Sequence, residues 1–232
     1  LGLVHETERA GIFKLLYATA FRDPSAYERF YTTPTFTYGN PAVRAERMRS
    51  LEAAWERRIG SGRLSASAYL FRLYDMIAPD AGGVVHNTRP LTGRGLELEF
   101  EQRWAERFSL RGGYTLQLPS GEGGRPDNAP RQMFKANLAA ELGGGFHGGL
   151  EAQHVTRRLA ASGTQAVGAY TLVNLNLRYQ PPARRWALSL GLYNLLDRRF
   201  SDPVAEDSTI AGPRWSMPQL GRTALLRSSL DF

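Results

Sequence analysis

Several absences limit what this chain can be. It contains no cysteine, so it has neither a disulfide framework nor a thiolate metal site. No stretch approaches about 18 uninterrupted apolar residues, which removes a transmembrane helix from consideration. Residues 1–6 lack the basic start, apolar core and cleavage site of a signal peptide. These absences still allow a membrane protein built from strands, because a membrane strand places only every second residue against lipid.

The charge of the chain is basic but evenly spread. The 232 residues carry a formal net charge of +7. The arginines are scattered one or two per expected strand, with no dense basic block and no basic helix. The sequence also lacks the stacking aromatic motif of proteins that bind single-stranded nucleic acid. We therefore expect no nucleic-acid partner.

Alternation of apolar and polar residues is the dominant pattern. From Leu96 to Glu101 every apolar residue is followed by a glutamate, and similar alternation fills most of the chain. A soluble core would not accept three unpaired glutamates on one face of a strand, whereas a water-filled lumen accepts them. The pattern predicts a barrel of the bacterial outer membrane, with apolar side chains toward lipid and charged side chains inside.

The expected strands are long, and short and long connections alternate between them. We expect strands near residues 1–6, 12–22, 46–58, 63–77, 92–104, 107–118, 132–142, 147–158, 169–180, 186–199 and 221–232. Most have about 10 to 15 residues, enough to cross a bilayer while tilted. Tight periplasmic turns and long external loops are typical of such barrels. The predicted fold is all-β: an antiparallel up-and-down transmembrane β-barrel segment of ten to eleven strands.

Six short motifs occur in a fixed order along the chain. They are Phe21-Arg22-Asp23-Pro24-Ser25, Asn40-Pro41 followed by Glu46, Gly95-Leu96-Glu97, Asn128-Ala129-Pro130-Arg131, Asn194-Leu195-Leu196-Asp197, and Gly221-Arg222 opening the last strand. In this order the chain resembles the C-terminal portion of a TonB-dependent outer-membrane receptor. It departs from the family pattern at Val43 and Ala45, where leucine and proline are usual. We interpret the motif residues as structural rather than catalytic: Phe21, Arg22, Pro24, Asn40, Pro41, Glu46, Gly95, Glu97, Asn194, Leu195, Asp197, Gly221 and Arg222.

The resemblance implies a 22-stranded barrel filled by an N-terminal plug. It also implies energised uptake of a scarce ligand, a ferric siderophore or cobalamin, with the TonB complex as a partner. The plug and the TonB box are absent from residues 1–232, so we expect one partial barrel domain that is inactive by itself. The expected location is the outer membrane of a Gram-negative bacterium, in contact with its lipid. Leu1 would mark a truncation, while Leu230 and Phe232 would form a native terminus that the barrel assembly machinery reads.

Candidate sites are few. The four histidines, His5, His86, His147 and His154, have no compact ligand spacing, so we expect no metal, no cofactor and no enzyme activity. The stripe of Glu97, Glu99, Glu101 and Arg103 could contact a plug, but a solvated, ion-paired barrel wall is the simpler interpretation. Aromatic and arginine side chains in external loops suit large, flat or anionic ligands, although they also pack loops together. These candidate ligand contacts are Tyr27, Arg29, Tyr31, Phe36, Tyr38 and Trp215.

Two other folds compete with this interpretation. A soluble β-sandwich is disfavoured because its strands are shorter. A self-contained barrel of ten or twelve strands, acting as a passive pore or a membrane enzyme, is the stronger rival. Pairing between the first and last strands would favour that barrel, whereas two free sheet edges would favour a portion of a larger one. The sequence leaves the identity of the ligand open, because loops and plug would select it.

Overall fold

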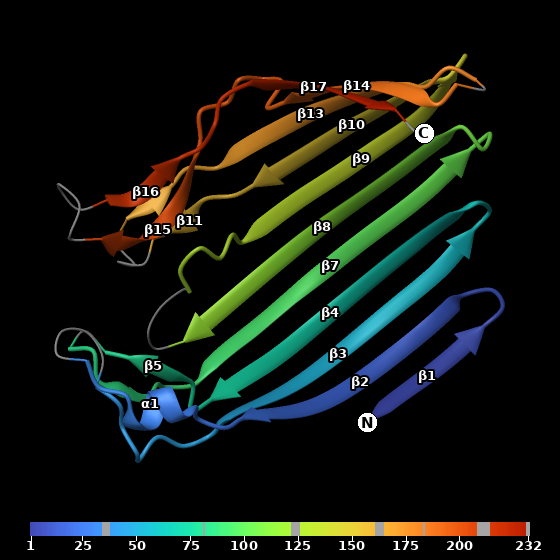
Figure 1. The fold of residues 1–232 in the computed structure, drawn as a ribbon. Helices are drawn as coiled ribbons and strands as arrows, with labels where there is room; N and C mark the ends of the chain where they lie inside the picture. The colour runs from blue at the N-terminus through green and yellow to red at the C-terminus, as the bar shows by residue number, and fades with distance from the viewer. Residues whose placement is uncertain are drawn as a thin grey trace. The chain divides into compact units, whose positions relative to one another are not determined.

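The computed structural model describes residues 1–33, 38–80, 82–121, 126–160, 165–182, 184–207 and 214–230. Eleven strands form one antiparallel sheet in the order β1 (Gly2–Thr7), β2 (Gly11–Arg22), β3 (Glu46–Ile59), β4 (Gly62–Tyr74), β7 (Leu91–Trp104), β8 (Phe108–Gly121), β9 (Gln132–Gly143), β10 (Phe146–Val155), β13 (Tyr170–Tyr179), β14 (Trp186–Tyr193) and β17 (Thr223–Leu230). Figure 1 shows β1 in blue and β17 in red as the two edge strands of this order. The predicted all-β, antiparallel up-and-down fold is confirmed. Among the described residues, no helix is long and apolar enough to span a bilayer.

The chain divides into two compact units. The first comprises Leu1–Trp55, Ser67–Leu96 and Leu118–Arg125. The second comprises Glu56–Ala66, Glu97–Gln117 and Pro126–Phe232.

The first unit begins with the β1–β2 hairpin. Leu3 lies opposite Leu15 and His5 opposite Phe13, and these two leucines and the phenylalanine are exposed. At the hairpin turn, the Trp55 indole N–H of β3 donates to the Ala10 carbonyl over 2.7 Å. An amphipathic tryptophan in that position suits the boundary between lipid and water.

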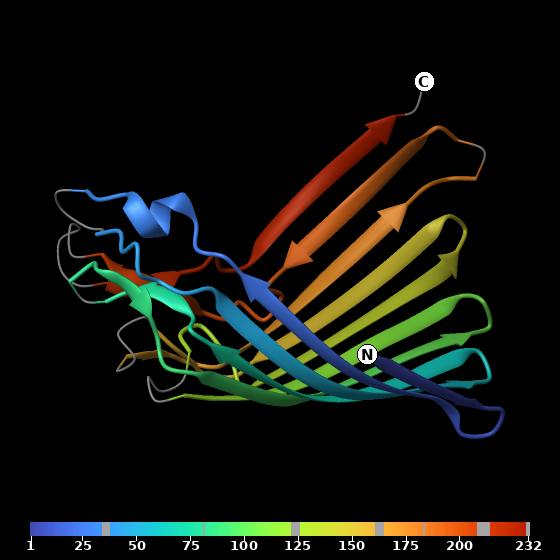
Figure 2. The same ribbon diagram turned by 90° about the horizontal axis from the view of Figure 1, so that it is seen from below.

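The other end of the first unit carries a short helix and a small hairpin. The helix is α1 (Ala26–Phe30), and the hairpin pairs β5 (Ile77–Pro79) with β6 (Val85–Asn87). Figure 2 shows α1 beyond the end of β2 that lies opposite the β1–β2 turn. The helix begins after Ser25, whose hydroxyl accepts the Glu28 backbone N–H while the Glu28 carboxylate accepts the Ser25 N–H. This reciprocal cap satisfies two backbone donors that would otherwise lack partners.

A continuous row of leucines crosses the second unit. Strand pairing sets Leu110, Leu138, Leu150, Leu175 and Leu192 side by side on five successive strands. Leu138 and Leu150 remain 38% and 42% exposed, and no large side chain among the described residues is fully buried. A soluble domain would bury such a row, because exposed contiguous apolar surface is unfavourable in water. The row therefore marks the face of the sheet that contacts lipid.

Aromatic rings gather at the turn end of the second unit. Phe146 stacks on Tyr179 with ring centroids 4.4 Å apart, and Trp186 meets Tyr179 edge-on at 5.7 Å. These residues flank the β9–β10 and β13–β14 connections, and at the first of these Gly143, Gly144 and Gly145 all have positive φ angles. Aromatic residues at this level form the interfacial girdle of a membrane barrel.

Three predicted strands end at least three residues earlier than expected, and the long connections are not structureless. The strands expected over 63–77 and 147–158 end at Tyr74 and Val155, and the strand expected over 186–199 ends at Tyr193. The prediction for 186–199 was wrong because Asn194 and Asp197 adopt left-handed backbone angles, with φ of 51° and 50°, which interrupt an extended strand. The connections contain β11 (Arg158–Leu159), β12 (Ala166–Val167), β15 (Ser201–Asp207) and β16 (Arg214–Pro218).

Candidate functional site

The helix α1 presents an aromatic pair at the loop end of the first unit. Tyr27 and Tyr31 lie one helical turn apart and stack with ring centroids 4.5 Å apart, while each remains about half exposed. Arg29 lies between them in sequence, and its Nε is buried without a hydrogen-bond partner in the described part of the chain. Exposed stacked rings offer flat apolar surface, and tyrosine adds a polar edge, so this helix could contact a large planar or anionic ligand.

Arg22 fixes this helix to the sheet. Its guanidinium contacts both Glu46 carboxylate oxygens over 2.7 and 2.8 Å, and both Glu28 carboxylate oxygens over 2.9 and 3.0 Å. Glu46 also accepts the backbone N–H of Ile77 over 2.8 Å. One planar cation therefore joins β2, α1 and β3, and Glu46 extends the connection to β5. Bidentate pairs of this kind add directional precision that a lysine could not supply.

The Glu28 carboxylate gives this connection a pH dependence. Hydrogen bonds from Arg22, and then from Ser25, lower the pKa of Glu28 from 4.5 to about 2. Its stabilising contribution is therefore complete above pH 4.5 and is lost as the pH falls from 4.5 toward about 2. We expect hydrogen exchange of the α1 amides, corrected for intrinsic rates, to accelerate across that window.

The matched control is Glu28→Gln, which cannot ionise and should show weakened protection at every pH in the window. An acceleration on acidification that is equal in the wild type and in Glu28→Gln would contradict the assignment of the pH dependence to Glu28.

The segment around Asn40 holds Tyr38 against the small hairpin. The Asn40 side chain donates to the Val85 carbonyl over 3.0 Å, and Tyr38 exchanges backbone hydrogen bonds with Gly83 and Val85. Pro41 follows directly in the turn. Tyr38 is 42% exposed, whereas Phe36 lies outside the described residues. The first unit thus brings Tyr38, Tyr27 and Tyr31 to its loop end.

A charged hollow lies on one face of the second unit. Glu101 accepts from Arg103 over 3.2 Å and from Arg111 over 3.3 Å. Glu97 and Glu99 make no ion pair with a described residue. The hollow has a volume of about 240 Å³, and its polar lining consists of Arg63, Glu99, Glu101, Arg111, Lys135 and Asn137. Because the hollow is lined by both cationic and anionic side chains, it is better suited to contact a hydrated protein surface than to bind a single small ion.

Arg158 is a buried cation that sequence reasoning missed. Only 6% exposed, it donates to Asn128 over 3.1 Å, to the Ser201 carbonyl over 3.0 Å and to Asp202 over 2.8 Å. Its guanidinium also lies over the Tyr170 ring, 5.3 Å from the centroid. These partners belong to the connections that follow β8 and β14 and to the first residue of β13. Arg158 therefore ties together three loop regions. Strand β11, which contains Arg158, lies at the end of the second unit opposite the β9–β10 turn (Figure 1).

Asn194 and Asp197 form the corner after β14. Asn194 is 5% exposed, and its side chain accepts from the Arg198 N–H and donates to the Arg198 carbonyl, over 2.8 and 2.9 Å. Asp197 accepts the backbone N–H of Arg222 over 2.9 Å. A Cβ at Gly221 would lie 3.0 Å from the same Asp197 carboxylate oxygen, so glycine allows this close approach. Both side chains bond local backbone, which is the usual function of short polar residues in tight turns.

The remaining predicted site residues are placed as follows. Pro24 and Phe21 flank the end of β2, and Phe21 is 75% exposed. Gly95 and Glu97 lie within β7, and Leu195 follows Asn194 in the corner. Trp215 lies on β16 in the second unit and is 38% exposed. Leu230 ends β17 opposite Trp186, and Phe232 lies outside the described residues. The described residues contain no group of three His, Asp or Glu that could hold a metal ion.

Comparisons with known proteins identify the family. The family described as "TonB dependent receptor-like, beta-barrel" matches residues 11–195, well over half of the chain. No curated protein matches the sequence.

Solved structures share the fold at low sequence identity. The ferric yersiniabactin uptake receptor FyuA from Yersinia pestis is 17% identical with a TM-score of 0.82, and the match covers 100% of this chain and 36% of FyuA. The ferric-catecholate import receptor Fiu from E. coli K12 is 16% identical with a TM-score of 0.79, and the match covers 100% of this chain and 34% of Fiu. FpvA from P. aeruginosa, solved with an iron-loaded pyoverdine, is 14% identical with a TM-score of 0.76. The match covers 100% of this chain and 32% of FpvA.

The chain spans about a third of the length of these receptors. The family match and the eleven-stranded antiparallel sheet agree with the resemblance in the sequence motifs, and they place the protein in the outer membrane. The chain belongs to the TonB-dependent receptor-like β-barrel family.

Proposed function

We propose that this chain supplies eleven strands to the barrel of a receptor that imports a scarce ligand across the outer membrane. The ligand class best supported is a ferric siderophore, with cobalamin as the second choice. The observation that carries the proposal is the family match over residues 11–195. Because the chain spans about a third of its structural relatives, uptake is assigned to the whole receptor and not to residues 1–232 alone.

The loop end of the first unit supports a large ligand with flat or anionic groups. Tyr27 and Tyr31 present a stacked and half-exposed pair beside Arg29, on a helix that Arg22 holds to the sheet. Binding residues are often carried on loops that a rigid scaffold positions. Three of the structurally similar receptors are described by ferric catecholate, yersiniabactin or pyoverdine ligands. A metal chelate of that class matches the aromatic and cationic chemistry of this surface.

Partners follow from the same assignment. The charged hollow around Glu101 and Arg111 would face a hydrated plug domain, since its paired charges need a polar neighbour. The plug would in turn receive energy from the TonB complex. The exposed end of β17 at Leu230 would be recognised by the barrel assembly machinery during insertion.

A self-contained pore or membrane enzyme is the weaker candidate. β1 and β17 are edge strands in the sheet order, whereas a self-contained barrel would pair its first and last strands. The family and the structural neighbours are transport receptors rather than enzymes.

Uptake of radioactive iron tests the proposal. The full-length receptor and residues 1–232 alone would be expressed in a receptor-null strain and supplied with iron-loaded catecholate, hydroxamate and mixed siderophores. We expect the full-length receptor to import at least one of them in cells with a working TonB complex, and residues 1–232 to import none. Uptake by residues 1–232 alone, or uptake that persists without the TonB complex, would contradict the proposal.

A further inference from the structure

The hairpin of β15 and β16 stands apart from the main sheet of the second unit. Its two strands form a sheet of their own, with Ser201 opposite Pro218 and Asp202 opposite Met217, and neither strand belongs to the eleven-stranded sheet. A lone two-stranded hairpin is only marginally stable in water. The order of this hairpin therefore depends on contacts that lie outside its own ladder.

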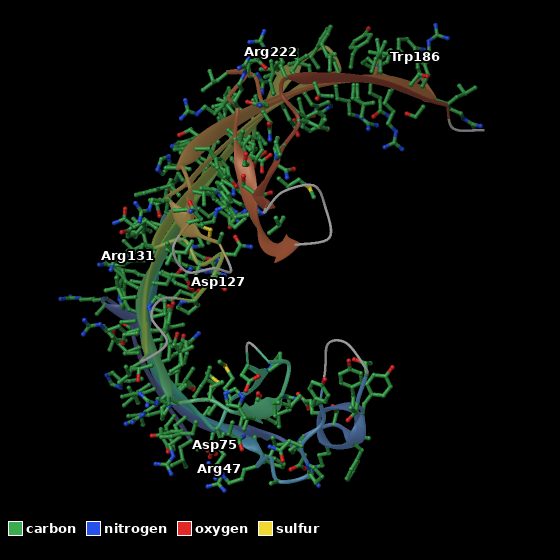
Figure 3. All side chains as sticks on the ribbon, turned by 90° about the vertical axis from the view of Figure 1, so that its left-hand side faces the viewer. Arg47, Asp75, Asp127, Arg131, Trp186 and Arg222 are labelled. Carbon is green, nitrogen blue, oxygen red and sulfur yellow. The ribbon has the colours of Figure 1, made fainter. Side chains whose placement is uncertain are left out.

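The hairpin presents large apolar side chains on the water-filled side of the sheet. Trp215 and Met217 share one face of β16 by alternation and are 38% and 57% exposed. Figure 3 shows the hairpin, in orange to red, on the side of the second unit's strands away from the labelled Trp186. Trp186 lies on the same face of β14 as Leu192 of the lipid-facing row. Trp215 is therefore carried on the side through which a ligand would pass.

Arg158 holds the base of the hairpin. Its guanidinium donates to the Ser201 carbonyl over 3.0 Å and to the Asp202 carboxylate over 2.8 Å. Residues directly opposite each other in an antiparallel pair share a face, so Asp202 lies on the same face as its partner Met217. Trp215 is two residues from Met217 on that face. Arg158 therefore binds the hairpin from the face that carries Trp215.

The same guanidinium is fixed to the rest of the second unit. It donates to Asn128 in the β8–β9 connection over 3.1 Å, and it lies 5.3 Å from the ring centroid of Tyr170. Tyr170 pairs with Val155 in the eleven-stranded sheet and is 8% exposed. The Phe200 ring, directly before β15, packs on Tyr170 with centroids 4.5 Å apart. One buried cation thus joins the hairpin to the end of the main sheet and to a neighbouring loop.

We propose that Arg158 is a positioning residue for ligand binding: by fixing the β15–β16 hairpin to the sheet, it holds Trp215 where the ligand contacts it. This inference rests on the proposed function, because it takes Trp215 as a ligand contact. An aromatic side chain that is already ordered binds at a lower entropic cost than one that becomes ordered on binding. The planar fork of arginine suits this role, since it donates to Asn128 and to Asp202 at the same time.

The mobility of a spin label tests the positioning without any ligand. A nitroxide would be attached at Ser216→Cys in the full-length receptor, with any cysteine outside residues 1–232 replaced, since these residues contain none. Ser216 lies on the face of β16 away from Trp215, so the label leaves that face free. We expect a slow-motion spectrum in the otherwise unchanged receptor and an added fast component in Arg158→Met. The exposed neighbour supplies the matched control, Arg157→Met, which should keep the slow-motion spectrum.

A double-mutant cycle on the Kd for the iron-loaded siderophore tests the consequence for binding. Trp215→Ala and Arg158→Met should each weaken binding roughly 10-fold, which is the contribution of one large aromatic contact. The double variant should also bind only about 10-fold more weakly, because a Trp215 that is no longer held in place has no contact left to lose. Arg157→Met should leave the Kd unchanged, both alone and combined with Trp215→Ala.

Two further variants separate position from charge and from a failure to fold. Arg158→Lys keeps the charge, but its single nitrogen cannot reach Asn128 and the hairpin together, so it should behave as Arg158→Met does in both measurements. Asp202→Ala removes the hairpin end of the contact and leaves the buried cation in place. It should also mobilise the label and show no additional loss of affinity when combined with Trp215→Ala. Hydrogen exchange of the β9 and β10 amides at wild-type rates would show that each variant is folded.

Three outcomes would overturn the proposal. The first is a slow-motion spectrum in both Arg158→Met and Asp202→Ala, because ring packing at the base of the hairpin would then be sufficient. The second is a loss of affinity of about 100-fold in Arg158→Met/Trp215→Ala, which would make the two contributions independent. The third is wild-type affinity in Arg158→Lys, which would assign the effect to charge. If no siderophore binds the receptor, the proposed function fails, while the spin-label spectra still decide whether Arg158 holds the hairpin.

Discussion

Arg158→Met should loosen the loops of the second unit while leaving the long strands in place. Methionine fills a similar volume but donates no hydrogen bond, so Asn128 and the Ser201 carbonyl lose their buried donor and Asp202 loses its counter-ion. We expect a local cost of about 2 kcal/mol, moderated because the Asp202 side chain is 41% exposed to water. Hydrogen exchange of the β11 and β15 amides in the full-length receptor should then be roughly 30-fold faster.

The control for this prediction lies next to it in the sequence. Arg157 is exposed and has no ion pair among the described residues, so Arg157→Met removes the same charge without removing a buried contact. Its exchange rates should match the wild type. Equal protection in the two variants would show that the hydrogen bonds of Arg158 contribute little to loop order.

Tyr31→Ala combined with Trp215→Ala should weaken ligand binding by the full-length receptor on the order of 100-fold. Large aromatic residues supply much of the energy at a binding surface, and truncating two of them removes contacts worth about 1 to 2 kcal/mol each. Tyr31 and Trp215 are 49% and 38% exposed, so their rings are available to a ligand. The measurement is the Kd for the iron-loaded siderophore that the uptake assay identifies.

A second double variant separates ligand contact from the general loss of aromatic packing. Phe146→Ala with Trp186→Ala removes one ring of a stacked pair and a tryptophan of similar exposure, but at the turn end of the second unit. This control variant should bind the iron-loaded siderophore with wild-type affinity. Unchanged ligand affinity in Tyr31→Ala/Trp215→Ala would mean that these aromatics only pack the loops.

The long strands are predictable because their pattern is strictly local. Side chains alternate with period two, so the face that Leu138 or Leu150 occupies within its own strand can be inferred from the sequence before any pairing is known. Motifs such as Asn194 to Asp197, which resemble those of TonB-dependent receptors, then indicate the family. The register between strands and the exact strand ends depend on contacts across the sheet, which alternation alone does not specify.

The loop contacts could not be predicted in the same way. Arg157 and Arg158 are identical neighbours in the sequence, yet one is exposed and the other is almost fully buried. Alternation no longer applies beyond Val155, where the strand ends, and the partners of Arg158 come from residues 30 to 44 positions away. The cap at Ser25 and Glu28 is different, because a serine followed three residues later by glutamate is a visible start signal for a helix. The helix was not predicted, because the residues between the strands expected near 12–22 and 46–58 were assigned to a connection.

The direction of the two edge strands has a further consequence. Every neighbouring pair in the sheet is antiparallel, so the first and the eleventh strands, β1 and β17, point the same way. An uninterrupted antiparallel ring that contains this sheet must therefore insert an odd number of strands between β17 and β1. If two copies of the sheet lay side by side in the same orientation, β17 of each copy would meet β1 of the other, and both junctions would be parallel. A second copy of the sheet therefore cannot complete an antiparallel barrel in this way. A polypeptide that completes the ring must contribute an odd number of strands. The eleven further strands that would make a barrel of twenty-two meet this condition.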